Sequence, residues 1–156
     1  MRHSRLLPLL AVALAACSTT RQEPAVASPA AGTATSTGPA TGIEFLGSRG
    51  ALSQAVRVGN LLYMSGQLGT DSARGITPET RLVMEKIKAT VERYGSSMDR
   101  VVKCTVFLVD MSEWGAMNAV YTTYFPADKR PARSAVGTNG LVNNGRVEIE
   151  CIAVMP

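Results

Sequence analysis

The stretch VVKCTVFLV, which runs from Val101 to Val109, is the part of the sequence that decides the fold. It is rich in β-branched and apolar residues on both of its alternating sides, as a strand in the centre of a sheet is. The more polar side carries Lys103 and Thr105. The side expected to face a helix-covered core carries Val102, Cys104, Val106 and Leu108. The sequence therefore predicts a sheet built around this strand.

An amphipathic helix is predicted upstream of this strand, from about Pro78 to Tyr94. Thr77 can cap this helix, and Glu79 favours the positive end of its dipole. Gly95 supplies a natural stop after the last helical residue. The apolar residues that recur at three- and four-residue spacing are Val83, Ile87, Val91 and Tyr94.

A second helix is predicted downstream of the strand, capped by Ser112 and ending before Pro126. Its expected buried stripe consists of Met117, Val120, Tyr121 and Tyr124. We interpret Trp114, Met117 and Tyr121 as core residues and not as a cofactor box, so no cofactor is expected.

The remaining strands lie on either side of these elements. Ser53–Val58 and Leu61–Ser65 enclose Gly59-Asn60, where the glycine can take a positive φ and close a hairpin. Further strands are predicted at Ile43–Leu46, Arg133–Val136 and Arg146–Val154. The order β, β, helix, β, helix, β, β indicates an α+β fold with two helices packed on one face of the sheet.

The second face of this sheet also carries apolar side chains, which need cover. The residues concerned are Phe107, Val109, Ile152 and Val154. A partner chain is the simplest cover. Cys104 and Cys151 both point to the apolar side of their strands, so we expect buried free thiols. A disulfide between them stays open as an alternative, because an extracytoplasmic compartment permits one.

The N-terminal segment has the pattern of an export signal. A basic start is followed by an apolar run that is too short to span a bilayer, and small residues precede Cys17. We expect residues 1–16 to be a lipoprotein signal peptide and Cys17 to be lipidated, which would anchor the chain to a membrane without a spanning helix. An ordinary signal peptide is the alternative. Ser18 in place of an aspartate is typical of lipoproteins bound for an outer membrane, on the periplasmic side.

Residues 17–42 are expected to form a flexible linker, since they are rich in Ala, Thr, Ser, Pro and Gly. Residues 43–156 have the size of one small domain. Loss of Arg2 and Arg5 with the signal lowers the Lys and Arg count from 16 to 14 against 12 acids. A net charge near +2 is too small to argue for a nucleic-acid partner.

The only histidine of the sequence is His3, inside the expected signal peptide. Without histidine, serine and cysteine triads are excluded, and so are almost all zinc, copper and non-haem iron sites. No metal is expected. Any catalysis must therefore use carboxylates, arginine, hydroxyl groups, backbone dipoles and water.

Five segments resemble the Rid family, also called YjgF. They are VGNLLYMSGQ at 58–67, VKCTVFLVD at 102–110, Asn118 with Tyr121 and Phe125, PARSAV at 131–136, and VEIECIAV at 147–154. The match covers essentially all of residues 43–156 in order. The resemblance implies a chorismate-mutase-like fold and a homotrimer, with the uncovered sheet faces packed inward and three clefts between subunits.

The resemblance also implies an activity, because deaminases of this family hydrolyse 2-imino and 2-enamino acids to 2-keto acids and ammonia. Arg133 aligns with the arginine that binds the substrate carboxylate, which suits a planar guanidinium that can donate two parallel hydrogen bonds. Glu148 aligns with the acidic residue near the attacking water, although a salt bridge at a subunit interface is an equal alternative. Ser65 and Asn118 align with polar positions that line the cleft.

Two positions depart from the family pattern. Leu52 stands where the deaminases carry a tyrosine in a GPY segment, and Ala135 stands where many carry a cysteine. Leu52 makes one side of the pocket more apolar, so we expect a changed or larger substrate. The rival hypothesis is a non-catalytic trimer that binds small carboxylates or acts as an interaction module. Endoribonuclease activity, attributed to some family members, is disfavoured by the small net charge and the lack of histidine.

Overall fold

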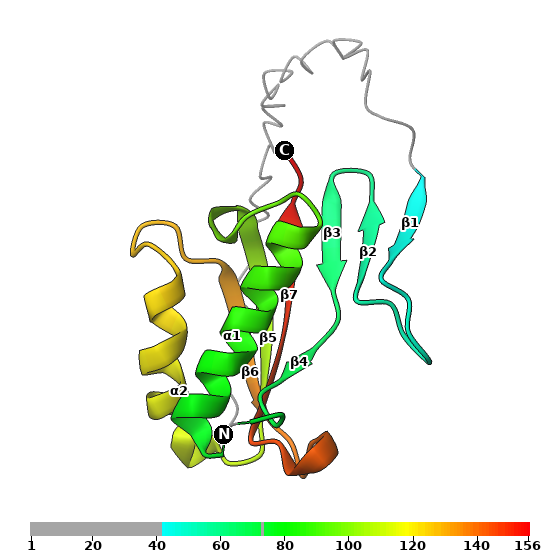
Figure 1. Cartoon of the computed structure of the whole chain (residues 1–156). Coiled ribbons are helices and arrows are strands. Elements are labelled where there is room, and N and C mark those ends of the chain that lie inside the picture. The colour runs from blue at the N-terminus through cyan, green and yellow to red at the C-terminus, as the bar shows by residue number, and fades with distance from the viewer. Residues whose placement is uncertain (1–41, 73) are drawn as a thin grey trace, which may run out of the picture. The chain divides into compact units, whose positions relative to one another are not determined.

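The computed structural model describes residues 42–72 and 74–156, which form one mixed sheet with two helices (Figure 1). The expected signal peptide, Cys17 and all of the linker but its last residue lie outside the described residues. The strands are β1 (Ile43–Leu46), β2 (Ala55–Val58), β3 (Leu61–Met64), β4 (Gln67–Leu68), β5 (Val101–Leu108), β6 (Ala132–Gly137) and β7 (Val147–Val154). The helices are α1 (Ile76–Arg93) and α2 (Trp114–Tyr121). No helix in the described ranges is long and apolar enough to cross a membrane.

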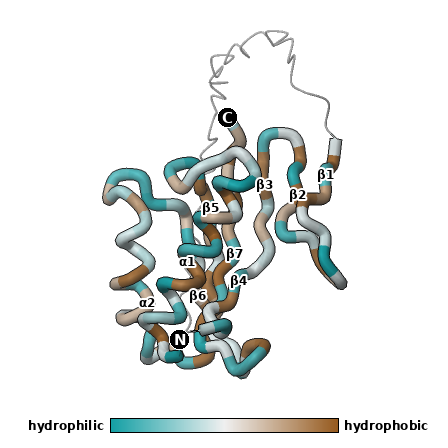
Figure 2. Tube along the Cα trace, viewed as in Figure 1, coloured by the Kyte–Doolittle hydropathy of each residue, from teal (hydrophilic) through white to brown (hydrophobic). Residues whose placement is uncertain are grey.

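The sheet has the strand order β1-β2-β3-β7-β5-β6, with β4 paired to β7. β5 lies between β7, to which it is antiparallel, and β6, to which it is parallel. Both helices cover the same face, as predicted (Figure 1). Apolar and polar residues alternate along them (Figure 2), and the buried apolar ones belong to the core. The largest fully buried side chains come from both layers and include Leu62, Met84, Ile87, Leu108, Met117 and Ile149.

The central strand departs from the prediction at its first residues. The pairing register with β7 shifts between Val101 and Lys103, which marks a β-bulge. Val101 is buried at 4% exposure, whereas Val102 is 44% exposed. The prediction that Val102 faces the core is therefore wrong, because the extra residue of the bulge reverses the alternation at that end of the strand.

Both helix starts also differ from the prediction. α1 begins at Ile76 after Gly75, so Thr77 lies inside the first turn and does not cap it. The buried carboxylate of Glu79 accepts hydrogen bonds from the backbone N–H groups of Gly75 (3.0 Å) and Arg146 (2.8 Å). A 3₁₀ turn, Met111–Glu113, precedes α2, and Asp110 caps this turn by accepting a hydrogen bond from the backbone N–H of Ser112 at 2.9 Å. Ser112 is therefore not the cap that the sequence predicts. In both places a carboxylate, and not the predicted hydroxyl of Thr77 or Ser112, accepts the hydrogen bond from the backbone N–H group.

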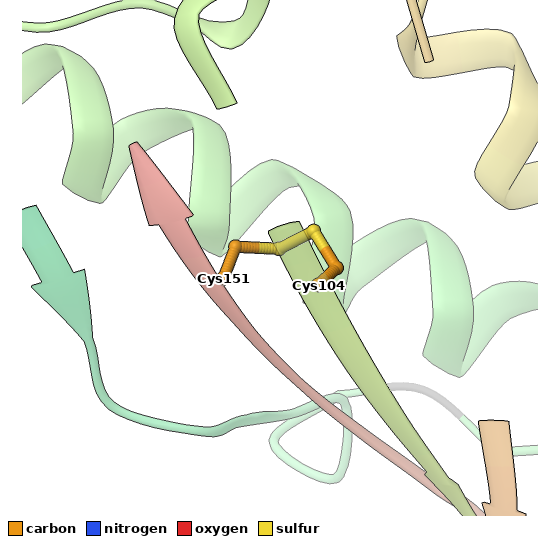
Figure 3. Close-up of a disulfide and its surroundings, with 2 residues drawn as sticks. All are labelled: Cys104 and Cys151. Atoms are coloured by element: carbon orange, nitrogen blue, oxygen red, sulfur yellow. A yellow bond between two sulfur atoms is a disulfide. The ribbon is translucent and has the colours of Figure 1, made fainter. Parts of the chain in front are cut away.

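Cys104 of β5 and Cys151 of β7 form a disulfide (Figure 3). The two cysteines are direct partners across the antiparallel ladder, with their Cα atoms 4.1 Å apart, and both are buried. The prediction of free thiols is therefore wrong. The alternation of side chains along each strand predicts only that both cysteines face the core. Their closeness depends on the pairing register of β5 with β7, which places them opposite each other.

The face of the sheet opposite the helices leaves apolar side chains in contact with solvent. Phe45 is 68% exposed, Tyr63 is 43% exposed and Val136 is 44% exposed. Strand pairing places Phe45 and Tyr63 in one row with Val56 and Ile152. A single chain thus leaves this helix-free face uncovered, as the sequence predicts for its second sheet face.

Candidate functional site

Arg133 lies on the edge strand β6 and points towards α2. It pairs with Cys104 of β5, whose side chain faces the helix-covered core, so Arg133 projects on the same face. Its guanidinium carbon lies 4.5 Å from the ring centre of Tyr121 and 5.6 Å from that of Trp114. Both contacts are cation–π contacts. The guanidinium therefore contacts two aromatic rings of α2, and it has no salt-bridge partner among the described residues.

A hollow of about 190 Å³ lies beside this guanidinium. Its lining consists of Asn118, Tyr121, Thr122, Arg130, Pro131 and Arg133. Asn118 and Tyr121 project from one side of α2, three residues apart, which brings them to the same wall. The structure thus brings together Arg133 and Asn118, two of the residues predicted to bind substrate.

Tyr121 is an unusual component of this wall. It is 2% exposed, and its hydroxyl is buried without a hydrogen-bond partner among the described residues. Burial raises the pKa of Tyr121 to about 12, and the positive charge of Arg133 opposes this rise. The phenol is therefore neutral near pH 7, and its ring offers an uncharged face to the guanidinium.

The aromatic residues of α2 differ from the prediction in their burial. Met117 and Tyr121 are buried, as predicted, but Trp114 is 40% exposed and is not a core residue. Trp114 and Tyr121 both contact Arg133, a role that the analysis of the sequence missed. Their spacing of seven residues on one helix side was the available signal, because it aligns them with Asn118.

A second group of predicted residues lies on the helix-free face. Leu52 and Ser65 line a separate, open hollow of about 390 Å³ together with Phe45 and Val56. The Ser65 hydroxyl donates a 2.7 Å hydrogen bond to the backbone carbonyl of Ser53, so its proton is already committed. Leu52 is 58% exposed and offers only an apolar surface.

Glu148 belongs to the same side of the sheet. It pairs with Phe107 on β5, which places its side chain on the helix-free face. A Cβ added to Gly66 would collide with the Glu148 carboxylate, so this carboxylate lies directly against the Gly66 backbone, next to Ser65. Burial, and then the charge of Glu150, raises the pKa of Glu148. No described residue forms a salt bridge with it.

The predicted residues therefore fall into two groups on opposite faces of the sheet. Arg133 and Asn118 form the cationic hollow beside α2, whereas Leu52, Ser65 and Glu148 lie on the helix-free face. Ala135 is packed against the core opposite Val106 and does not line the cationic hollow. The described residues hold no cluster of three or more metal-ligating side chains.

Comparison with known proteins shows the family of this chain. A sequence model of the family described as Endoribonuclease L-PSP matches residues 43–155. The chain is 38% identical over 111 residues to the mouse 2-iminobutanoate/2-iminopropanoate deaminase, covering 67% of this chain and 82% of that protein. The chain belongs to the Rid (YjgF) family. The resemblance identified from the five segments is thereby confirmed.

Other Rid relatives support the same assignment. A RutC family protein of Pyrococcus horikoshii is 42% identical over 110 residues, which span 67% of this chain and 86% of that protein. The crystal structure of RidA from Psychrobacter sp. PAMC 21119 has 39% identity and a TM-score of 0.65, covering 71% of this chain and 94% of that one. A YjgF family member from Neisseria meningitidis has 27% identity and a TM-score of 0.70, covering 74% and 97%. The predicted sheet with two helices on one face is the fold of this family.

This Rid chain can use the two groups of residues for different tasks. The cationic hollow can bind an anion, because no acid in residues 42–72 and 74–156 pairs with the Arg133 guanidinium. Glu148 can accept a proton near neutral pH more readily than an ordinary carboxylate, since its pKa is raised. Within one chain, however, the anion site and the carboxylate are separated by the sheet.

Proposed function

We propose that this chain hydrolyses 2-imino and 2-enamino acids to 2-keto acids and ammonia, as an exported, lipid-anchored homotrimer. The observation that carries the proposal is the guanidinium of Arg133, which has no acidic partner in the described part of the chain and contacts Trp114 and Tyr121 beside a hollow. The name of the mouse relative, a 2-iminobutanoate/2-iminopropanoate deaminase, supports the same reaction.

The reaction begins with the substrate carboxylate on Arg133, through two parallel hydrogen bonds that fix the orientation of the adjacent C=N bond. A water molecule adds to the carbon of the protonated imine, and Glu148 takes one proton from this water. The resulting carbinolamine carries both a hydroxyl and an amino group. Glu148 gives its proton to the nitrogen and then takes the hydroxyl proton as the C–N bond breaks, which releases ammonia and leaves the 2-keto acid; the proton left on Glu148 passes to solvent. An enamine first takes a proton on carbon to become the imine.

Two features of the single chain support assembly into a trimer. Arg133 and Glu148 face opposite sides of the sheet, so one chain alone does not join them into one site. The helix-free face exposes Phe45, Tyr63 and Val136, which a neighbouring copy would cover. In a closed ring of three copies, each Arg133 hollow meets the Glu148 side of the next copy.

The location of the protein is a second part of the proposal. Cys17 follows an apolar run and small residues, which supports acylation after export. The domain would then be tethered on the periplasmic side of a membrane. Metabolic labelling with a radioactive fatty acid tests this part: the wild type should incorporate label and Cys17→Ser should not. Equal labelling of both would contradict it.

Hydrolysis of 2-iminobutanoate, generated in place, tests the reaction. The wild type should form 2-oxobutanoate faster than buffer alone, and Arg133→Ala should lose this excess rate. Arg93→Ala is the matched control, because Arg93 is an exposed arginine of α1 that bonds Gln54 outside the hollow. It should keep the wild-type rate.

The rival function is carboxylate binding without catalysis, and one observation favours it. Leu52 is 58% exposed where the deaminases of the family carry a tyrosine, so the hydroxyl of that residue is missing. Binding of 2-oxobutanoate by the wild type, with no rate above that of buffer, would support the rival and contradict hydrolysis. Cleavage of RNA by the wild type that Arg133→Ala abolishes would favour an endoribonuclease.

A further inference from the structure

The hollow beside α2 contains a second arginine that the proposed reaction does not use. Arg130 and Arg133 line it together, separated by Pro131 and Ala132. A turn closed by the Lys129 N–H, which donates to the Pro126 carbonyl at 3.1 Å, precedes Arg130. The rigid ring of Pro131 then leads the chain into β6. This short path places two arginines on one small hollow.

Neither of these positive charges is neutralised within the described part of the chain. The two salt bridges found there join Lys86 to Asp71 and Arg146 to Glu113. No acidic residue lines the hollow, and Asp128, the nearest acid along the chain, is not part of its wall. Two like charges at one concave surface raise the local positive potential, which a ligand with two negative charges relieves better than one with a single charge.

The lining also favours a small and polar ligand. Asn118 adds an amide that can donate or accept hydrogen bonds. The volume of about 190 Å³ is below the range of about 300–1,000 Å³ that is usual for drug-sized ligands. The hollow therefore fits a short molecule with an acid group at each end.

We propose that Arg130 selects dicarboxylate substrates: Arg133 binds the carboxylate beside the C=N bond, and Arg130 binds a second carboxylate at the end of the side chain. The imines of the acidic amino acids, aspartate and glutamate, are the substrate class with this chemistry. This inference rests on the proposed imine hydrolysis and adds the substrate class to it. Arg130 is a specificity residue in this account.

Binding of two product acids to the full chain tests the inference by calorimetry. The probes are 2-oxoglutarate, which has two carboxylates, and 2-oxobutanoate, which has one. The wild type should bind the dicarboxylate about ten- to a hundredfold more tightly, as expected for one additional charge-assisted contact. Arg130→Gln should bring the affinity ratio close to one, whereas Arg130→Lys should retain most of it.

Lys129→Gln is the matched control, because it removes a neighbouring positive charge that acts on Asp99 and does not line the hollow. It should leave the affinity ratio unchanged. A wild-type ratio near one, or the same ratio in Arg130→Gln, would overturn the dicarboxylate preference alone, provided that 2-iminobutanoate is hydrolysed. Binding of neither acid, with no hydrolysis of either imine, would overturn the proposed reaction as well.

Discussion

The cationic hollow beside α2 and the Glu148 surface on the helix-free face differ in what a single chain supplies. The hollow already has its charge, its aromatic support and its amide in place. The Glu148 surface has a carboxylate that forms no salt bridge with the residues that the structure describes, a serine hydroxyl that donates to Ser53, and an exposed Leu52. Under the proposed reaction, one chain supplies the groups for recognition, whereas hydrolysis would use a neighbouring copy to complete the site.

Arg133→Lys should have the largest effect on the recognition side of this comparison. Lysine keeps the charge but loses the two parallel donors and the planar stacking on Tyr121 and Trp114. We expect kcat/KM for 2-iminobutanoate to fall about a hundredfold, which corresponds to about 2.7 kcal/mol. A fall of less than threefold would show that charge alone binds the substrate.

Gly66→Ala should have the next largest effect, on the other region. The added methyl group would occupy the position of the Glu148 carboxylate and displace it. We expect kcat to fall about tenfold with little change in KM, since a displaced acid or base loses part of a contribution of about 10²–10⁴. Gly115→Ala is the control, because a Cβ there meets no atom within 4 Å. Equal kcat values for the two variants would remove Glu148 from the reaction.

The pH dependence of kcat should also report on Glu148. Burial raises its pKa above the ordinary value of 4.5, so activity that needs the ionised carboxylate should decline on the acidic side at a pH above 4.5. Glu148→Gln should abolish this decline along with most of the rate. A wild-type profile that stays flat down to pH 4.5 would contradict the role of Glu148 as a base.

The raised pKa of Glu148 also makes the stability of the folded chain depend on pH, and here the protonated carboxyl is the favourable form. The folded state holds the Glu148 proton at pH values where the unfolded chain has lost it. The carboxyl therefore contributes stability that is present below pH 4.5 and is lost as the pH rises through the folded pKa. Glu148→Gln should flatten this part of the stability profile in denaturant titrations.

The smallest effects should come from the aromatic support of Arg133. Trp114→Leu removes one cation–π contact and should weaken 2-oxobutanoate binding about fivefold, because such contacts contribute about 0.5–2 kcal/mol. Tyr121→Phe keeps the ring and removes a buried hydroxyl that has no hydrogen-bond partner among the described residues. It should keep the affinity and raise the melting temperature. A loss of affinity in Tyr121→Phe would mean that the hydroxyl contacts the ligand.

The sequence predicts those features that depend on local periodicity. The amphipathic pattern locates α1, and the alternation in residues 147–154 identifies the core side of β7, which is buried at Val147, Ile149, Cys151 and Ala153. The family segments place Arg133 and Asn118 at one site, and the structure puts both on one hollow. Local pattern and family resemblance therefore suffice for the fold and for grouping Arg133 with Asn118.

Features that depend on pairing between distant strands cannot be predicted from local patterns in the sequence. The Cys104–Cys151 bond requires the register of β5 against β7, and the bulge at Val101 reverses one end of a regular alternation. Each of these is set by geometry that no short stretch of sequence contains.

The most direct test of the two-copy site is complementation between two inactive variants. Arg133→Ala lacks the recognition group and Glu148→Gln lacks the base, so each trimer made of one variant should be inactive. If the site joins Arg133 of one copy to Glu148 of the next, co-assembly of equal amounts should restore activity at about a quarter of the sites, as random mixing in a ring of three gives. Mixed trimers that stay as inactive as either variant alone would contradict the account.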